Sequence, residues 1–278
     1  MPRLESLNIL LESEGKDYLS ELYGKVIENV NKQLVSVRMK NTDLSGNPEA
    51  GSVEAKRFAN AKSKQYGTAR AAGKGDAVKA EPVTVAINQD KEIVEDLEEK
   101  DIKLYGVDGV LDKRANNHVQ RMVSELDTEF FAVGKNEGTK ITPKSSTVED
   151  EIEEAIQTCE NTKNDFVDGV PRSMINLVCS TAYYGKIRTM LDKVSRPNID
   201  STVEEFYAYH GVKTFSSVHL PDGVDYEVMV DGAIAQPVMS NEYKPEKIPL
   251  SEAFAVELFY HYGTKAVMPD LIFYKEGA

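Results

Sequence analysis

The chain has few of the features that define disulfide-rich, zinc-binding or membrane proteins. Its 278 residues include only two cysteines, Cys159 and Cys179, too few for a disulfide framework or a four-ligand zinc site. No stretch approaches the roughly 18 uninterrupted apolar residues of a membrane span. Glu5, Glu12 and Glu14 interrupt the region where a signal peptide needs apolar residues, so we expect no export. The two cysteines are therefore expected to be small buried side chains in a reducing compartment.

The sequence also lacks an excess of positive charge, which argues against general nucleic-acid binding. The net charge is −13, whereas affinity for phosphates depends on basic side chains. The charge is uneven: residues 51–80 carry seven basic side chains and two acidic ones, and residues 81–101 carry eight acidic and two basic ones. This pattern suggests complementary surfaces, and two separate solvated faces remain an alternative.

The overall composition is that of a globular protein. Hydrophobic residues make up 41% of the chain and charged residues 28%, so long disorder is excluded for most of it. The length predicts one large domain or two modest ones.

Periodic apolar residues predict both helices and strands. Residues 4–36 fit one or two amphipathic helices that Gly15 interrupts, and residues 108–133 give the clearest helix, about 39 Å long. Thr147 resembles a helix cap that opens a helix running to about Thr162. The remaining regular elements are predicted as strands at 82–88, 174–179, 212–218, 254–262 and 271–274, a helix at 181–194, and a hairpin at 226–235 that turns on Asp231-Gly232.

Residues 51–80 are unusual because they are rich in alanine and glycine and contain few large apolar side chains. Such a stretch cannot bury enough surface to form its own core. We expect a long excursion, a β-hairpin with its tip near Ala72–Asp76. Loops of this length are usually functional or disordered.

Signals for catalysis are weak. Five residues separate Gly67 from Gly73, and Lys74 is followed by Gly75, so the stretch does not fit a Walker A motif. The sequence contains no GxSxG, HExxH or CxxC motif. The histidines share no metal-ligand spacing and are expected to be packed or surface side chains: His118, His210, His219 and His261. We therefore expect no enzyme activity, cofactor or metal.

Five stretches resemble the major capsid proteins of tailed double-stranded DNA bacteriophages, in the form found in siphophages. They are PVTVAINQDKEIVEDLEEKDI (82–102), LDKRANNHVQRMVSELDTEFF (111–131), YHGVKTFSSVHLP (209–221), MVDGAIAQP (229–237) and ELFYHYGTKAVMPDLIFY (257–274). The resemblance implies the α+β Hong Kong 97-type capsid fold. It also implies an N-terminal arm at 1–50, an extended E-loop hairpin at 51–81, a peripheral (P) domain at 82–165 with a spine helix at 107–133, a mixed α/β axial (A) domain at 166–270, and a C-terminal strand at 271–278 returning to the P domain.

The function implied by this resemblance is a structural one. The chain would self-assemble into hexamers and pentamers of an icosahedral phage head that encloses double-stranded DNA, and it would be assembled in the bacterial cytoplasm. Implied partners are a separate scaffolding protein, because the chain starts almost directly with the arm, a portal protein, a decoration protein, and packaged DNA in weak contact. No membrane contact is expected.

The resemblance, taken together with the charge pattern, implies which residues form the subunit contact. A loop without its own core is useful if it lies across a neighbouring subunit and places its cations against acidic surface. The predicted contact residues are Arg57, Lys62, Lys64 and Arg70 on the loop and Glu92, Glu95, Glu98 and Glu99 on the acidic segment. The alternatives are an encapsulin-like bacterial shell protein and a soluble α/β enzyme with a disordered loop.

Overall fold

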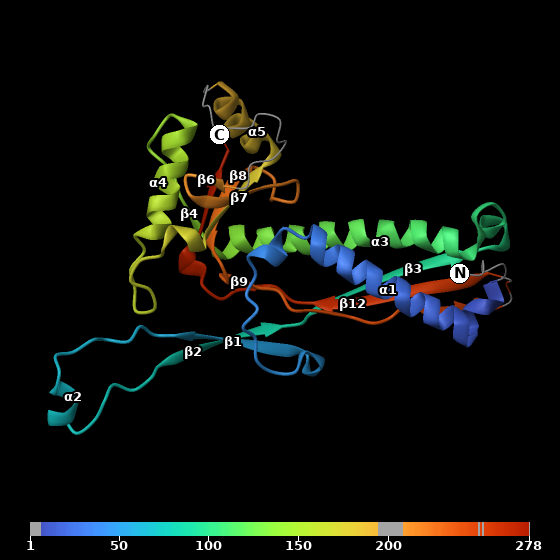
Figure 1. The fold of residues 1–278 in the computed structure, drawn as a ribbon, viewed down its shortest axis with the longest axis horizontal. Coiled ribbons are helices and arrows are strands. Elements are labelled where there is room, and N and C mark those ends of the chain that lie inside the picture. Colours follow the sequence, from blue (N-terminus) through green and yellow to red (C-terminus); the bar gives the residue numbers. More distant parts are fainter. Residues whose placement is uncertain (1–6, 194–207, 250, 252, 278) are drawn as a thin grey trace. The chain divides into compact units, whose positions relative to one another are not determined.

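The computed structural model describes residues 7–193, 208–249, 251 and 253–277 and divides into two units (Figure 1). Unit 1 comprises Met1–Val37, Ile87–Asp127 and Pro237–Gly263, and unit 2 comprises Arg38–Ala86, Thr128–Gln236 and Thr264–Ala278. The described helices are α1 (Ser13–Gln33), α2 (Thr68–Ala71), α3 (Glu99–Glu137), α4 (Val148–Glu160) and α5 (Thr181–Lys193), with short 3-10 helices η1 (Leu7–Leu11), η2 (Ser36–Arg38), η3 (Pro48–Ala50), η4 (Arg172–Met174) and η5 (Pro269–Leu271). The described strands are β1 (Ser52–Phe58), β2 (Ala80–Ala86), β3 (Gln89–Leu97), β4 (Thr139–Lys140), β5 (Ile175–Ser180), β6 (Ala208–Tyr209), β7 (Val212–Ser217), β8 (Val224–Val230), β9 (Ile234–Ala235), β10 (Val238–Ser240), β11 (Lys244–Lys247), β12 (Phe254–Tyr262), β13 (Lys265–Ala266) and β14 (Ile272–Glu276).

Unit 1 is built on a four-stranded antiparallel sheet with β12 at its centre. The whole of β3 pairs with one side of β12, and β10 and β11 pair one after the other with its opposite side. Side chains alternate between the two faces of a strand, and on β12 every second one is buried, as the sequence predicted: Phe254, Val256, Leu258, Tyr260 and Tyr262. These side chains share one core with apolar residues of α1 and α3, so both helices cover the same face of the sheet.

The two helices of unit 1 differ in part from the prediction. Gly15 does not interrupt the first helix: it lies inside α1, where an added Cβ would approach the carbonyl oxygen of Ile9 to 2.1 Å. This glycine therefore permits close packing between η1 and α1. The spine helix is confirmed as the long part of α3, which is separated from a short preceding turn of helix by the non-helical Gly106 (φ 73°).

Unit 2 contains a six-stranded mixed sheet in the order β4-β14-β8-β5-β7-β6. One face packs against α4 and α5 in a second apolar core. The predicted cap is confirmed, because the Thr147 side chain accepts a hydrogen bond from the backbone N–H of Asp150 (3.2 Å). The other face of the sheet meets the end of α3, where an added Cβ on Gly134 would lie 2.5 Å from the Glu227 carboxylate.

Glu227 of β8 is fully buried, and within the described part of the chain neither of its side-chain oxygens has a hydrogen-bond partner. Removal from water raises its pKa well above the ordinary value of 4.5, and the positive charge of Lys135 opposes this only in part. The side chain is therefore a buried acid between the sheet and the spine helix that keeps its proton to a higher pH than an exposed glutamate does.

The predicted hairpin at 226–235 is wrong. Asp231 and Gly232 do form the turn after β8, but β8 pairs with β14 and β5, whereas β9 pairs with β13. The two strands flanking the turn therefore have different partners. The predicted domain boundaries divide the chain differently from the two units and stay a prediction; for example, β12 falls in the predicted A-domain segment but pairs with β3.

Candidate subunit-contact site

The E-loop, defined as residues 51–81, leaves unit 2 as an antiparallel hairpin (Figure 1). β1 and β2 pair from Ser52↔Ala86 to Phe58↔Ala80, so the hairpin was predicted correctly. This register centres the loop on residue 69, so its tip lies at α2. The prediction had placed the tip a few residues later, at 72–76. Among the side chains that the structure describes, those at the base of the hairpin form a core, in which Val53, Ala55 and Val85 pack with Ala235 and Val267 of the same unit.

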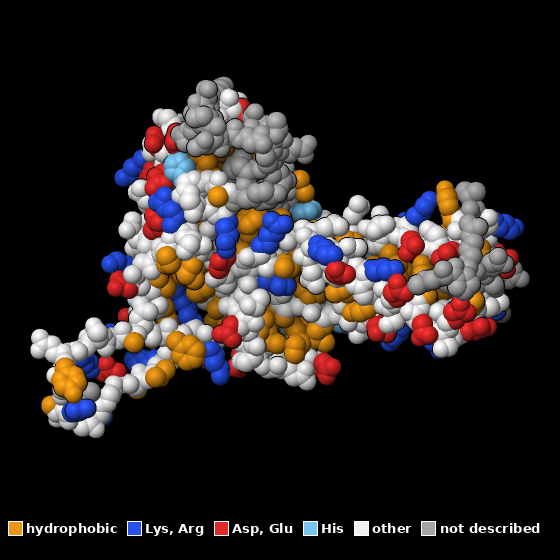
Figure 2. Space-filling view, viewed as in Figure 1, with side chains coloured by type: hydrophobic (Ala, Val, Ile, Leu, Met, Phe, Trp, Pro, Cys, Tyr) orange, Lys and Arg blue, Asp and Glu red, His pale blue; other side chains and the backbone are white. Residues whose placement is uncertain are grey.

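Most of the described residues in the distal part of the E-loop (59–79) are exposed, and they include both cations and apolar side chains (Figure 2). Tyr66 is 92% exposed and Val78 84% exposed. Lys64 lies 2.6 Å from Asp76, and the guanidinium of Arg70 lies 5.4 Å from the Tyr66 ring centre. Exposed apolar side chains that gather in a patch mark sites where another chain binds, whereas single ones are common on protein surfaces.

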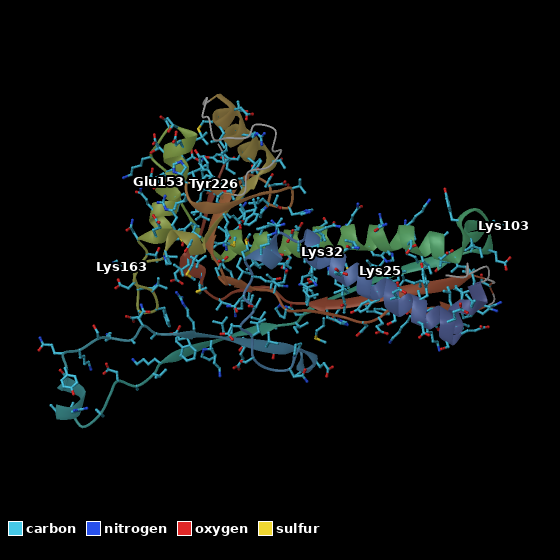
Figure 3. All side chains as sticks on the ribbon, viewed as in Figure 1. Lys25, Lys32, Lys103, Glu153, Lys163 and Tyr226 are labelled. Atoms are coloured by element: carbon cyan, nitrogen blue, oxygen red, sulfur yellow. The ribbon has the colours of Figure 1, made fainter. Side chains whose placement is uncertain are left out.

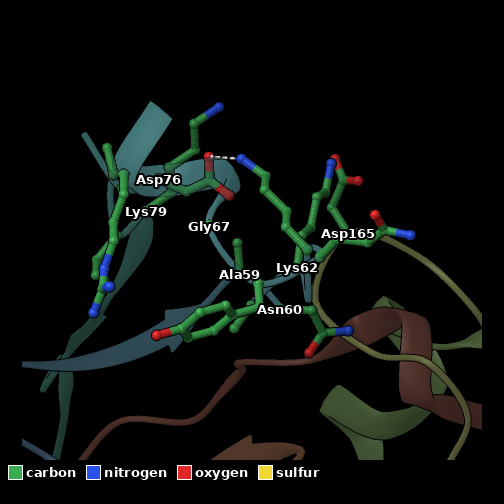
Figure 4. A pocket seen from close by; sticks show the side chains of 15 residues that line it. Ala59, Asn60, Lys62, Gly67, Asp76, Lys79 and Asp165 are labelled. Atoms are coloured by element: carbon green, nitrogen blue, oxygen red, sulfur yellow. Dashed lines mark hydrogen bonds and ion pairs between the residues drawn. The ribbon is translucent and has the colours of Figure 1, made fainter. Parts of the chain in front are cut away.

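The two limbs of the distal loop surround an open hollow of about 1050 Å³ (Figure 4). It is lined by four cations of the loop, Lys62, Lys64, Arg70 and Lys79, together with the acids Asp76 and Asp165. The surplus of positive charge favours an acidic partner surface over a basic one.

Arg57 occupies a different environment from the other predicted cations. Its guanidinium makes two hydrogen bonds to the carboxylate of Asp270 (2.5 and 2.7 Å) and lies 4.5 Å from the ring centre of Phe166. Only 13% of the Arg57 side chain is exposed. Burial raises the pKa of Asp270, but the hydrogen bonds and charge of Arg57 outweigh it, so that this pKa lies below its ordinary value.

The predicted acidic residues do not form one surface. Glu92 and its neighbours Asp90 and Asp96 are exposed on the face of β3 away from the helices, whereas Glu95 points to the helix side. There Glu95 binds Arg114 and lies 3.1 Å from His118. The hydrogen bond from Arg114 lowers the pKa of Glu95 against the opposing effect of burial.

The last two predicted acids lie beyond β3. Glu98 is exposed and pairs with Lys100 at 2.6 Å, and Glu99 is exposed at the start of α3. The side of the unit 1 sheet that the helices leave open thus contains Glu92 but not Glu95. Sequence reasoning missed that the same face also carries Val94, which is 46% exposed, and Phe259 of β12, which lies opposite Glu92. The alternation along β12 could have predicted this, because Phe259 lies between the buried Leu258 and Tyr260 and must therefore point to the opposite face.

Three of the residues considered for catalysis or metal binding are buried side chains packed in the interior of the protein. His118 is buried, its Nδ1 lies 2.7 Å from the Tyr243 hydroxyl, and burial lowers its pKa. Cys159 and Cys179 are both buried, which raises the pKa of the Cys159 thiol to about 12 and that of Cys179 further. Among the described residues, no three His, Cys, Asp or Glu side chains gather as metal ligands would. In the same residues, no helix has the length and apolar character required to cross a bilayer.

The fold resembles that of chains from several viral and virus-like particles. No protein-family model matches the sequence, and no curated protein is similar to it. A chain of Mycobacterium phage Che8 is 18% identical, with a TM-score of 0.62 over 83% of this chain and 85% of that one. A chain in the capsid of cyanophage P-SCSP1u is 13% identical, with a TM-score of 0.61 over 86% of both chains. A virus-like particle from Pyrococcus furiosus gives 13% identity and a TM-score of 0.56 over 93% of this chain and 99% of that one. These similarities show that the chain has the Hong Kong 97-type capsid fold that its sequence predicted.

Proposed function

We propose that this chain is the major capsid protein of a tailed bacteriophage and forms the hexamers and pentamers of an icosahedral head around double-stranded DNA. The E-loop is the observation that carries the proposal: a hairpin of about 30 residues has a core only at its base, with exposed apolar and basic side chains beyond it. Such a loop makes few stabilising contacts in a single chain and can make many when it lies across a neighbouring subunit. The fold shared with a phage capsid chain supports the same conclusion.

The proposal includes the partners and the location expected for such a protein. A separate scaffolding protein, a portal protein and a decoration protein would act with the shell in the host cytoplasm and the virion. Contact with packaged DNA would be weak, because the net charge of −13 disfavours tight binding to phosphate.

Within a shell, we place the distal E-loop of one copy against the acidic open face of unit 1 in the next copy. The contact would use Lys62, Lys64 and Arg70 on the loop, with Glu92 on the sheet and Glu98 and Glu99 beside it. Glu95 contributes less to this contact because Arg114 already binds it.

A shortened loop tests the function. Residues 60–78 are replaced by a short Gly/Ser bridge that keeps β1, β2 and their buried side chains. Closing the shorter loop changes the free energy of unfolding by about 1 kcal/mol or less, so the chain keeps its circular dichroism spectrum and solubility. We expect no regular shells by negative-stain microscopy where the full-length chain forms them. Normal shells from the shortened chain would refute this role of the loop.

Charge reversal tests the contact. Lys62→Glu with Lys64→Glu is compared with Lys25→Glu and Lys32→Glu on α1 (Figure 3), which changes the net charge equally at lysines that are 56% and 65% exposed. We expect the loop pair to reduce shell yield more than the α1 pair, and raised salt to weaken assembly of the parent, since exposed charges are screened over about 10 Å at 0.1 M. Equal yields from both pairs would show that these loop lysines are only solvated.

An encapsulin-like shell is the second candidate, favoured by the coverage of the Pyrococcus furiosus virus-like particle. The two candidates differ in what the particles contain. Particles purified after nuclease treatment and analysed for protected DNA and for co-purified cargo protein distinguish them. Protected DNA supports the phage head, and protein cargo without DNA supports the encapsulin-like shell.

A further inference from the structure

The E-loop is connected to the rest of unit 2 by a short series of contacts near its base. Backbone hydrogen bonds of 2.8 Å join Ser45 and Glu54 in both directions, and the N–H of Asn60 donates to the carbonyl oxygen of Asp165 (2.9 Å). Among the described residues, no hydrogen bond or ion pair joins residues 61–78 to the rest of the chain. The direction of the distal loop is therefore decided at its base.

Arg57 adds two charged hydrogen bonds to these contacts and brings three segments together. It lies one residue before the end of β1, Asp270 lies in η5, and Phe166 lies in the loop that follows α4 and contains Lys163 (Figure 3). The side-chain amide of Asn164 also donates to the Asp270 carboxylate. Two parallel hydrogen bonds fix the plane of the guanidinium, and the ring of Phe166 fixes which way that plane faces.

Because Arg57 lies at the base of the hairpin, a small change in this contact moves the tip of the loop by a larger distance. About ten residues separate it from the centre of the loop, and at about 3.3 Å per residue these reach about 30 Å. A tilt of about 10° at the base then moves the tip by about 5 Å. A displacement of this size is enough to misplace the exposed cations relative to a partner surface, because a hydrogen bond or ion pair requires atoms within about 3–4 Å.

We propose that Arg57 is a positioning residue: by binding Asp270 and stacking on Phe166 it sets the direction in which the E-loop leaves its own subunit. This role does not require Arg57 to contact a neighbouring chain. The effect on shells rests on the proposed function, whereas the direction of the loop in a single chain does not.

The direction can be measured with a pair of spin labels. Cysteines are introduced at Lys74 near the loop tip and at Thr158, which is exposed on α4 of the same unit. The native cysteines are buried, so they react slowly with the label. Pulsed electron paramagnetic resonance then gives the distribution of distances between the labels in the unassembled chain.

We compare Arg57→Ala and Asp270→Asn with a matched control, Lys56→Ala, the exposed neighbour on the same strand. We expect the distribution to widen or shift by about 5 Å in both Arg57→Ala and Asp270→Asn and to stay unchanged in the control. Asp270→Asn keeps the shape of the side chain and serves if Arg57→Ala fails to fold. Folded Arg57→Ala or Asp270→Asn chains with the parent distribution would overturn the proposal.

Shell assembly is the second measurement and separates the two hypotheses. Widened distances with a loss of regular shells support both the positioning role and the proposed contact of the loop with a neighbour. Widened distances with normal shells support the positioning role and refute the proposed contact.

Discussion

The buried acid Glu227 gives a quantitative prediction about stability and pH. Its carboxyl group has no hydrogen-bond partner among the residues that the structure describes and lies against Gly134 of the spine helix, and burial raises its pKa well above the ordinary value of 4.5. The folded chain therefore retains this proton at pH values where the unfolded chain has lost it. The perturbation we consider is Glu227→Gln, which keeps the shape and removes the titration.

The direction in which stability changes with pH follows from how many protons the folded and the unfolded chain bind. Below about pH 4.5 both states hold the proton, and the stabilising contribution of the neutral buried acid is fully present. As pH rises towards the folded-state pKa, the unfolded chain alone releases the proton, and the free energy of unfolding falls by about 1.4 kcal/mol per pH unit. Above the folded-state pKa both states are ionised and the loss is complete.

The assay is urea denaturation of the unassembled parent and Glu227→Gln chains at half-unit steps from pH 5 to pH 8. The amide has its own fixed cost in the apolar site, but that cost does not change with pH. We expect the stability of Glu227→Gln relative to the parent to rise by about 1.4 kcal/mol per pH unit until the folded-state pKa is reached. Glu92→Gln, which removes a carboxylate from the exposed face of β3, is the matched control. A constant difference between the Glu227→Gln and parent chains at every pH would refute the assignment of Glu227 as a buried neutral acid.

Three further substitutions test the packing of the helices. Leu126→Asp places a charge at a site 1% exposed in the core of unit 1 and should cost several kcal/mol, so recovery of soluble chains with a cooperative thermal transition would contradict the placement of that face. Gly15→Ala should lower stability by about 1–3 kcal/mol in thermal melts, although alanine is the better helix former, because its Cβ would meet the carbonyl oxygen of Ile9; a stabilised variant would refute this close contact. Thr147→Ala should cost about 1 kcal/mol in urea melts because it removes the cap of α4, and Thr147→Ser, which keeps the hydroxyl, should restore most of this.

The sequence predicted those elements whose signal is local. The step of three or four residues along 107–133 gave the spine helix, and the alternation along 254–262 gave the central strand of unit 1. The cap at Thr147 was also readable, because both partners lie within one turn of helix. The fold itself was predicted from the resemblance of five stretches of the sequence to phage major capsid proteins.

Strand partners and side-chain contacts were not readable, because they join distant parts of the chain. Asp231-Gly232 has the composition of a hairpin turn, yet the neighbours of β8 come from β5 and β14. Arg57 appeared to be one more loop cation, and its partner Asp270 lies 213 positions later. Glu95 appeared equivalent to Glu92 because no separate strand was predicted over 89–97, although residues three apart in a strand lie on opposite faces.

The interleaved order of unit 1 has a consequence for biosynthesis. The apolar stripe of α1 is complete at Leu34, but β12, against which the same core packs, begins only at Phe254. At 5–20 residues per second, a ribosome needs about 10 to 45 s to make the intervening 220 residues. During that interval the N-terminal helix has no native sheet to cover, so unit 1 folds only late in translation. The apolar face of the N-terminal helix therefore lacks its native cover in the nascent chain until the last strands of unit 1 have been made.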